Sequence, residues 1–278
     1  MTVRRLISGA IYALSGTIGI LAFIYPFFVP VSSQTPSTYA RSLDAPLLTA
    51  ALVGLSVVAL LIELQGQAIS AKTVAMLGIL VAVPSVLRFL EVAFPMPGGF
   101  SPIFAPIIIS GYVFGGRFGY LMGTFTLLTS GLITGGVGPW LPYQMFTAGW
   151  AGLTAGWLRK IPTLGDRPSQ SHQNLEFGPW RLGVLSAFGF IWGLLYGVIV
   201  NVYFWPFAAG PVAQSWAPGI GLGETLSRYA VFYAVTSLTW DLLRGAGNVL
   251  LTLLLGAPMV KTLTRFRRRF AFEVNSHA

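Results

Sequence analysis

The chain of 278 residues contains no cysteine, only two histidines and few charged residues. Without cysteine it forms no disulfide and has no thiolate chemistry. His172 and His277 both lie in polar segments, so the apolar segments carry no imidazole. Charged residues make up 9% of the chain, whereas a soluble domain carries about 25%. Because 54% of the residues are hydrophobic, one soluble core would not bury them, and a lipid bilayer is the solvent that fits this composition.

The motifs of common membrane enzymes and of ATPases are also missing. A Ser–His protease would need a histidine on a helix, and an aspartyl protease or a prenyl transferase would need paired aspartates. The phosphate-binding run Gly-x-x-x-x-Gly-Lys-Ser/Thr does not occur either. We therefore expect no enzyme activity, no metal and no cofactor. Active transport by this chain would take its energy from a partner or from an ion gradient.

The apolar residues predict an all-α polytopic membrane protein. A spanning helix needs about 20 mostly apolar residues, and we identify eight candidate segments. They are residues 6–29, 46–64, 72–93, 102–115, 118–136, 143–158, 180–204 and 227–257. The first segment is longer than a typical signal-peptide core and lacks a nearby cleavage site, so we interpret it as a retained helix.

The basic residues predict the orientation of these segments. Lys and Arg number 17 against 8 Asp and Glu, and with eight spans most of them fall on one side. The residues on that side are Arg4, Arg5, Lys72, Arg117, Arg159, Lys160, Arg167, Arg181, Lys261, Arg265, Arg267, Arg268 and Arg269. The opposite side holds only Arg41 and Arg228. Cytoplasmic loops carry such an excess, so we expect a protein of the cytoplasmic (cell) membrane with both termini in the cytoplasm.

The predicted outer loops are rich in Pro, Gly and aromatic residues. They cover residues 95–99, 135–143 and 205–223. Gly and Pro favour turns, and Trp and Tyr suit the membrane interface. Two interpretations stay open for these loops, an aromatic belt alone or a set of loops that closes over a ligand.

Small residues recur at every fourth position in three series. The series are Gly111, Gly115, Gly119 and Gly123; Ala148, Gly152 and Gly156; and Gly189, Gly193 and Gly197. This spacing lets helix backbones approach closely in lipid, so it predicts a tightly packed bundle and carries no information on function.

Ionisable residues at membrane depth are functional candidates because burying a charge in lipid is costly. Arg88 and Glu91 lie three positions apart, and Asp241 and Arg244 repeat that spacing. Each pair shares a helix face, so each is either a structural ion pair or a source of ligand contacts. The structural role is favoured for Glu91 and Arg244. For Arg88 and Asp241 the two roles are evenly balanced.

Two runs in the middle of the chain point to a known family. They are GYVFGGRFG at residues 111–119 and TGGVGPWLPYQM at residues 134–145. They resemble the S components of energy-coupling factor (ECF) transporters, in which a short helix ends in a Gly-x-x-x-Gly turn, followed by a long helix and a Gly/Pro-rich outer loop. The second run is similar to an actinobacterial branch. The resemblance extends over residues 70–260 and is strongest from 105 to 158.

The resemblance implies a six-helix S-component core at residues 67–260. Residues 1–66 would then be a two-helix transmembrane extension, a departure from the family whose role is open between lipid contact and contact with the coupling subunit. Residues 261–278 would form a basic cytoplasmic tail. The family also implies partners, a transmembrane coupling subunit and two ATPases. Its Ala-x-x-x-Ala coupling motif fits Ala71 and Ala75, and Gly78 and Ala82 extend that small face.

The mechanism implied is capture of a vitamin from outside, closure of the outer loops, and toppling of the whole subunit in the membrane. Aromatic residues would stack on a planar ligand, and a few polar groups would orient it. The candidate substrate-binding residues are Arg88, Trp140, Tyr143, Gln144, Asn201, Tyr203 and Asp241. Cobalamin is the first candidate ligand from the resemblance to the branch, with thiamine-related compounds, riboflavin and other cofactor precursors open.

Two alternatives come from other functional classes. A stand-alone secondary transporter or channel would show ion coupling and often inverted repeats, but no convincing repeat relates the two halves of the chain. A structural or assembly protein would bind no ligand, so replacing Gln144 or Asn201 with alanine would leave any uptake phenotype unchanged.

Overall fold

The computed structural model describes residues 2–28, 54, 58, 71–94, 100–161, 177–208 and 210–275. Side chains are described from residue 9 to residue 268 within these ranges, except at positions 25 and 71–73. The predicted segment 46–64 therefore lies outside the described residues apart from Gly54 and Val58, and so does the predicted loop 95–99.

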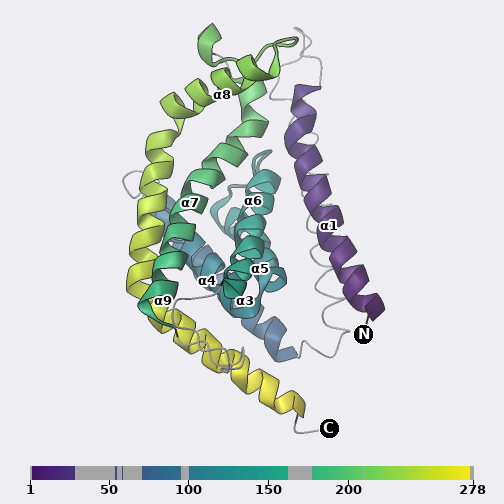
Figure 1. The fold of residues 1–278 in the computed structure, drawn as a ribbon, viewed down its shortest axis with the longest axis vertical. Helices are drawn as coiled ribbons and strands as arrows, with labels where there is room; N and C mark the ends of the chain where they lie inside the picture. The colour runs from purple at the N-terminus through teal and green to yellow at the C-terminus, as the bar shows by residue number, and fades with distance from the viewer. Residues whose placement is uncertain are drawn as a thin grey trace.

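The described residues form helices and connecting segments and contain no strand, which confirms the all-α prediction. The α-helices are α1 (Thr2–Ile24), α3 (Ala71–Ala93), α4 (Phe104–Phe114), α5 (Gly116–Thr134), α6 (Leu141–Ala155), α7 (Pro179–Phe204), α8 (Leu222–Thr236) and α9 (Leu238–Asn275). Short 3-10 helices lie between them: η1 (Tyr25–Phe27), η3 (Gly156–Lys160), η4 (Trp205–Phe207) and η5 (Val212–Gln214). Figure 1 shows the long helices α7 and α9 side by side and α1 along another side of the bundle.

Three described helices are long and apolar enough to cross a membrane. These stretches are Val74–Ala93, Pro179–Phe207 and Leu238–Arg268. Shorter apolar helices cover Gly9–Ile24 and Phe104–Phe114. Many large apolar side chains on the outside of the bundle are exposed, among them Ile79, Leu132 and Leu254. Such a surface is unfavourable in water and suits lipid, so the chain is a membrane protein.

The predicted eighth segment, 227–257, is not one helix. α8 ends at Thr236, and α9 begins at Leu238 after a non-helical Ser237. The side chain of Thr236 donates to the carbonyl of Phe232, and the Ser237 hydroxyl accepts a bond from Asn201. Side-chain bonds of Ser and Thr compete with the helical ladder and often bend it. Apolar periodicity alone did not reveal this break.

The small-residue series pack as predicted. A Cβ built on Gly119 would meet the backbone of Gly152, and one on Gly123 would meet the backbone of Ala148. Gly111 faces Gly152 in the same way. Helices α4, α5 and α6 therefore touch backbone to backbone, which requires residues without bulky side chains.

Gly115 makes the turn between α4 and α5. Its φ of 103° lies in a region that residues with a side chain rarely adopt, and its N–H caps α4 by donating to the Gly111 carbonyl at 2.9 Å. Glycine is therefore required here for conformational reasons as well as for packing. The turn reverses the chain within one residue and lets α5 return along α4 and α6.

Candidate functional site

The site is built from charged residues on α3 and α9. On α3, the guanidinium of Arg88 donates to the side-chain oxygen of Gln144 on α6 at 3.4 Å. One turn further on, the Glu91 carboxylate accepts a bond from Ser101 at 2.9 Å. Both groups point into the bundle, because helix positions three apart share a face. Arg88 therefore joins α3 to the beginning of α6, and Glu91 joins it to the segment before α4.

On α9, Asp241 and Arg244 form an ion pair. The Asp241 residue is only 2% exposed and lies in the first turn of α9, where the helix dipole favours a negative charge. Its carboxylate lies against Gly197 of α7, so any larger residue at 197 would collide with it. The Arg244 guanidinium lies 5.2 Å from the centre of the Tyr196 ring, in a cation–π arrangement.

Tyr196 of α7 brings the two pairs together. The charges of Arg88 and Glu91 on α3 and of Asp241 and Arg244 on α9 all influence its hydroxyl, and the Arg244 guanidinium is the one that lies over its ring. Glu91 likewise interacts with both arginines, although Arg88 and Arg244 come from different helices. We call Arg88, Glu91, Gln144, Tyr196, Asp241 and Arg244 the polar cluster. It contains two positive and two negative side chains, one amide and one buried tyrosine.

An aromatic stack lies next to the polar cluster. The rings of Tyr143 on α6 and Tyr203 on α7 are parallel to within 8° and their centres are 4.0 Å apart. Both are buried, at 3% and 6% exposure. Tyr143 precedes Gln144 of the polar cluster, and Tyr203 lies two helical turns after Tyr196 on the same face. The aromatic stack and the polar cluster therefore share helices α6 and α7 and lie within about two helical turns of each other.

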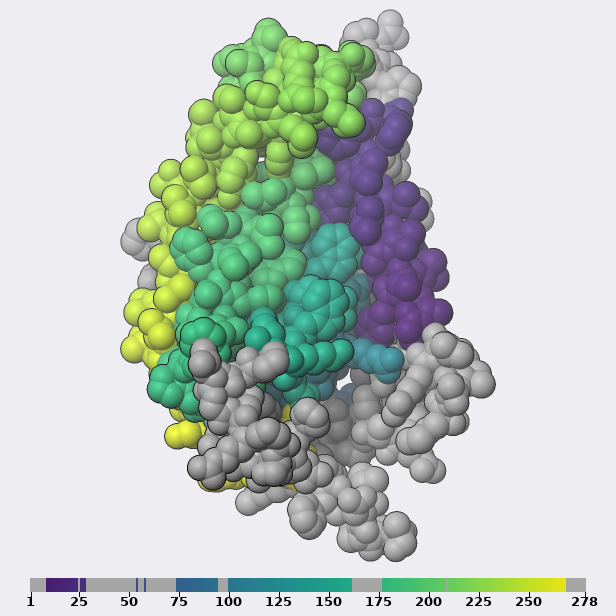
Figure 2. Space-filling view, in the orientation of Figure 1, coloured from purple at the N-terminus to yellow at the C-terminus, as the bar shows by residue number. Residues whose placement is uncertain are grey.

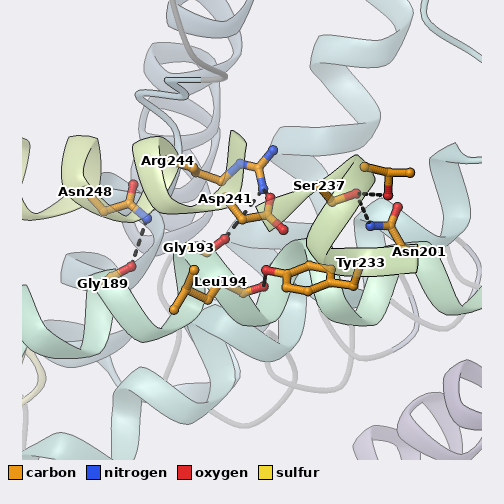
Figure 3. Close-up of polar contacts among 10 residues, drawn as sticks. Gly189, Gly193, Leu194, Asn201, Tyr233, Ser237, Asp241, Arg244 and Asn248 are labelled. Atoms are coloured by element: carbon orange, nitrogen blue, oxygen red, sulfur yellow. Dashed lines mark hydrogen bonds and ion pairs between the residues drawn. The ribbon is translucent and has the colours of Figure 1, made fainter. Parts of the chain in front are cut away.

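A polar seam joins α7 to α9 and α8 beside this region (Figure 3). Asn248 donates to the Gly189 carbonyl at 2.9 Å, and Asn201 donates to the Ser237 hydroxyl at 2.7 Å. Tyr233 lies over α7 and donates to the Leu194 carbonyl at 3.5 Å. These bonds hold the break between α8 and α9 against α7. Asn201, predicted to contact a ligand, thus supports the helix break in this structure.

Trp140 is separate from the buried groups. Its indole N–H donates to the Gly136 carbonyl at 3.2 Å, so the ring folds back onto its own loop. The side chain is 44% exposed. The structure therefore joins Arg88 to Gln144 and Tyr143 to Tyr203, pairs Asp241 with Arg244, and leaves the Trp140 ring on its own loop.

Sequence reasoning missed three residues of this region. Tyr196 is central to the polar cluster, and its seven-residue spacing from Tyr203 was the available signal. Ser101 carried no signal, since one serine in a loop is uninformative. Phe23 of α1 packs its ring against Tyr143, with ring centres 4.9 Å apart, and no pattern in the sequence relates these two distant positions.

The predicted coupling face of α3 points away from the bundle. Ala75, Gly78 and Ala82 are exposed, and a Cβ built on Gly78 would meet nothing within 4 Å. The opposite face of α3 buries Leu77 and Val81 in the core. The side chain of Ala71, the remaining predicted contact, lies outside the described residues.

Basic side chains gather at the end of α4 that is remote from the α8–α9 break. Arg159 and Arg267 both donate to the carbonyl of Val113, at 3.4 and 2.7 Å. Arg181 donates to the hydroxyl of Tyr112 at 3.0 Å. Arg159 and Arg267 thereby bond a carbonyl at the carboxyl end of α4, where the helix dipole favours positive charge. They are among the residues that the charge pattern assigned to the cytoplasmic side.

The comparisons with known proteins identify one family. A family model described as ECF transporter, substrate-specific component, matches residues 72–256, which is more than half of the chain. No curated protein and no solved structure matches the chain. The matched range begins at α3 and ends within α9, so it contains the polar cluster and the aromatic stack and leaves out α1.

Proposed function

Because the chain belongs to the substrate-specific components of ECF transporters, we propose that it captures a vitamin or cofactor precursor at the polar cluster and the aromatic stack. Members of this family are transporter subunits that work with a coupling component and ATPases. The chain is accordingly a membrane subunit of such an importer. The identity of the ligand and the residues that bind it are the parts that we propose.

One observation carries the assignment of the site. Charges from α3 and α9 act on the hydroxyl of buried Tyr196, and Arg88 bonds to Gln144, the residue that follows Tyr143 of the aromatic stack. Ion pairs that only pin two helices together need no third and fourth charge and no adjacent aromatic surface. Ligand pockets, in contrast, combine apolar and aromatic walls with a few convergent polar groups.

The chemistry of this region favours a flat ligand with polar groups of both signs. The Tyr rings offer a surface for stacking, the arginines donate hydrogen bonds, and the carboxylates accept them. Cobalamin stays our first candidate from the resemblance to the actinobacterial branch. Thiamine-related compounds and riboflavin also have flat rings with polar substituents.

We further propose the topology that the charge pattern predicts, eight spans with both termini in the cytoplasm. The gathering of Arg159, Arg181 and Arg267 at one end of α4 supports it, since cytoplasmic ends carry such an excess. The domain division at residues 66 and 260 is part of the same proposal. On this topology the break between α8 and α9 faces the outside.

The decisive experiment is to purify the protein and identify the small molecule that comes with it by mass spectrometry. We expect a vitamin or cofactor precursor. The Gln144→Ala variant should bind that compound about tenfold more weakly, because one oriented hydrogen-bond partner of Arg88 and of the ligand is lost.

The matched control is Leu132→Ala on the exposed face of α5, which should bind as the wild type does. A protein that carries no vitamin, and whose uptake collapses with the proton gradient rather than with loss of the ATPases, would be a secondary transporter and would contradict the proposal.

A second expectation concerns the coupling subunit. The Gly78→Leu variant should lose association with the coupling subunit while it keeps vitamin binding, because leucine at 78 fills an exposed small face and meets nothing in the bundle. Co-purification of a tagged coupling subunit measures the association. Ile79→Leu at the neighbouring exposed position is the control and should associate normally. Normal association of Gly78→Leu would exclude this face as the docking surface.

A further inference from the structure

Helix α1 lies outside the range that matches the family, yet it packs on the same helices that carry the proposed site. It contacts α6 and α7, and Figure 2 shows it lying along one side of the bundle. Gly19 permits this approach, because a Cβ at that position would meet the rings of Phe146 and Trp150 on α6 at 2.8 Å. The packing of α1 against α6 is therefore so close that position 19 requires glycine.

Two groups of contacts fix α1. Around the middle of the helix, Ser15 is hydrogen-bonded to the Tyr120 hydroxyl, and the rings of Tyr12 and Tyr120 meet edge to face with centres 5.5 Å apart. Near its end, Phe23 meets Tyr143 at 4.9 Å. Beyond Phe23, the ring of Phe27 lies 5.6 Å from that of Trp216 in the segment between η5 and α8. The first group anchors α1 to α5, and the second reaches the proposed site and its outer segment.

From this placement we infer that α1 forms part of the ligand site, with Phe23 as a third aromatic wall beside Tyr143 and Tyr203. The inference rests on the proposed function. Phe23 is 5% exposed and lies edge-on to the ring that would stack on the ligand. A ring in this position would border any flat molecule that stacks on Tyr143 and so would select which molecules fit. The N-terminal extension would thus determine specificity.

Phe27 extends this role to closure of the site. Its ring contacts Trp205 at 6.0 Å and Trp216 at 5.6 Å, both in the predicted outer region that follows α7. A shift of Phe23 on ligand binding would therefore also disturb the packing of this outer segment, because Phe27 of η1 follows Phe23 of α1 by only four residues. The end of α1 links occupancy of the aromatic stack to the position of an outer loop.

The test titrates cobalamin, riboflavin and thiamine separately into the purified full-length protein in lipid nanodiscs. With the compound that wild type binds, Phe23→Ala should raise the dissociation constant about tenfold, the size expected for loss of one aromatic contact. Leu21→Ala is the matched control, since Leu21 is on the same helix and 60% exposed. It should bind as wild type.

A double-mutant cycle separates a direct wall from a general loss of packing. If Phe23 and Tyr143 line the same ligand, the effects of Phe23→Ala and Tyr143→Ala on the dissociation constant should be non-additive by at least about threefold. Phe23→Leu replaces the alanine variant if that variant does not fold, and should give a smaller loss of affinity. Unchanged affinity in both Phe23 variants, or strict additivity, overturns the inference. If wild type binds none of the three compounds and carries no vitamin, the proposed function fails, and the inference fails with it.

Discussion

Replacing Arg244 with alanine is expected to destabilise the protein by about 3–5 kcal/mol and to abolish capture of the ligand. The change leaves the Asp241 carboxylate buried between α7 and α9 without its ion-pair partner. It also removes the cation from the Tyr196 ring. Thermal unfolding in nanodiscs measures the effect, and we expect the midpoint to fall by about 10 °C or more.

Two variants make this result specific. Glu224→Ala breaks a different ion pair, the one with Arg228 on α8, where Glu224 is exposed, and it should cost no more than about 1 kcal/mol. The double variant Asp241→Leu with Arg244→Met removes both charges and should recover most of the stability but no ligand binding. Recovery of binding in the double variant would mean that the pair is purely structural.

Replacing Gly193 with leucine is expected to separate α7 from α9 and to prevent folding, with a loss of at least about 3 kcal/mol. A Cβ at position 193 would meet the backbone of Gly245, at its N atom 2.6 Å away, and backbone atoms cannot move aside as a flexible side chain can. The Arg244 bond to the Gly193 carbonyl would be lost with the contact. The yield of monodisperse protein and its unfolding midpoint measure the loss.

The matched control is Gly183→Leu on the same helix. Gly183 is exposed, and a Cβ there would meet nothing within 4 Å. We expect this variant to fold as well as wild type or better, because leucine has the higher helix propensity and suits lipid. If the two variants behave alike, the glycine series on α7 serves something other than close packing.

The sequence predicted the elements of this fold well wherever local physics decides them. Apolar length gave α3, α4 and α7 to within two residues at each end, since a run of apolar residues bounded by Gly, Pro or charge has few other solutions in lipid. Small-residue spacing predicted the close contacts at Gly119 and Gly193. The break of the predicted eighth segment at Ser237 was not predicted, because it depends on a hydrogen bond from Asn201 of another helix.

The candidate site shows the same distinction. Charge and cost of burial were sufficient to single out Arg88, Glu91, Asp241 and Arg244 as two pairs. The influence of both pairs on Tyr196 was not predictable, because it requires the positions of α3, α7 and α9 relative to one another.

By itself, the sequence determined a membrane protein, its family and the residues that are costly to bury. Composition and short-range spacing act through local free energies that any fold must satisfy. Only the tertiary structure decided which of these residues meet, that Trp140 folds onto its own loop, and that Phe23 of α1 lies on Tyr143. Those contacts arise from side chains that pack between helices far apart in the chain, and the spacing of residues along the sequence does not predict such packing.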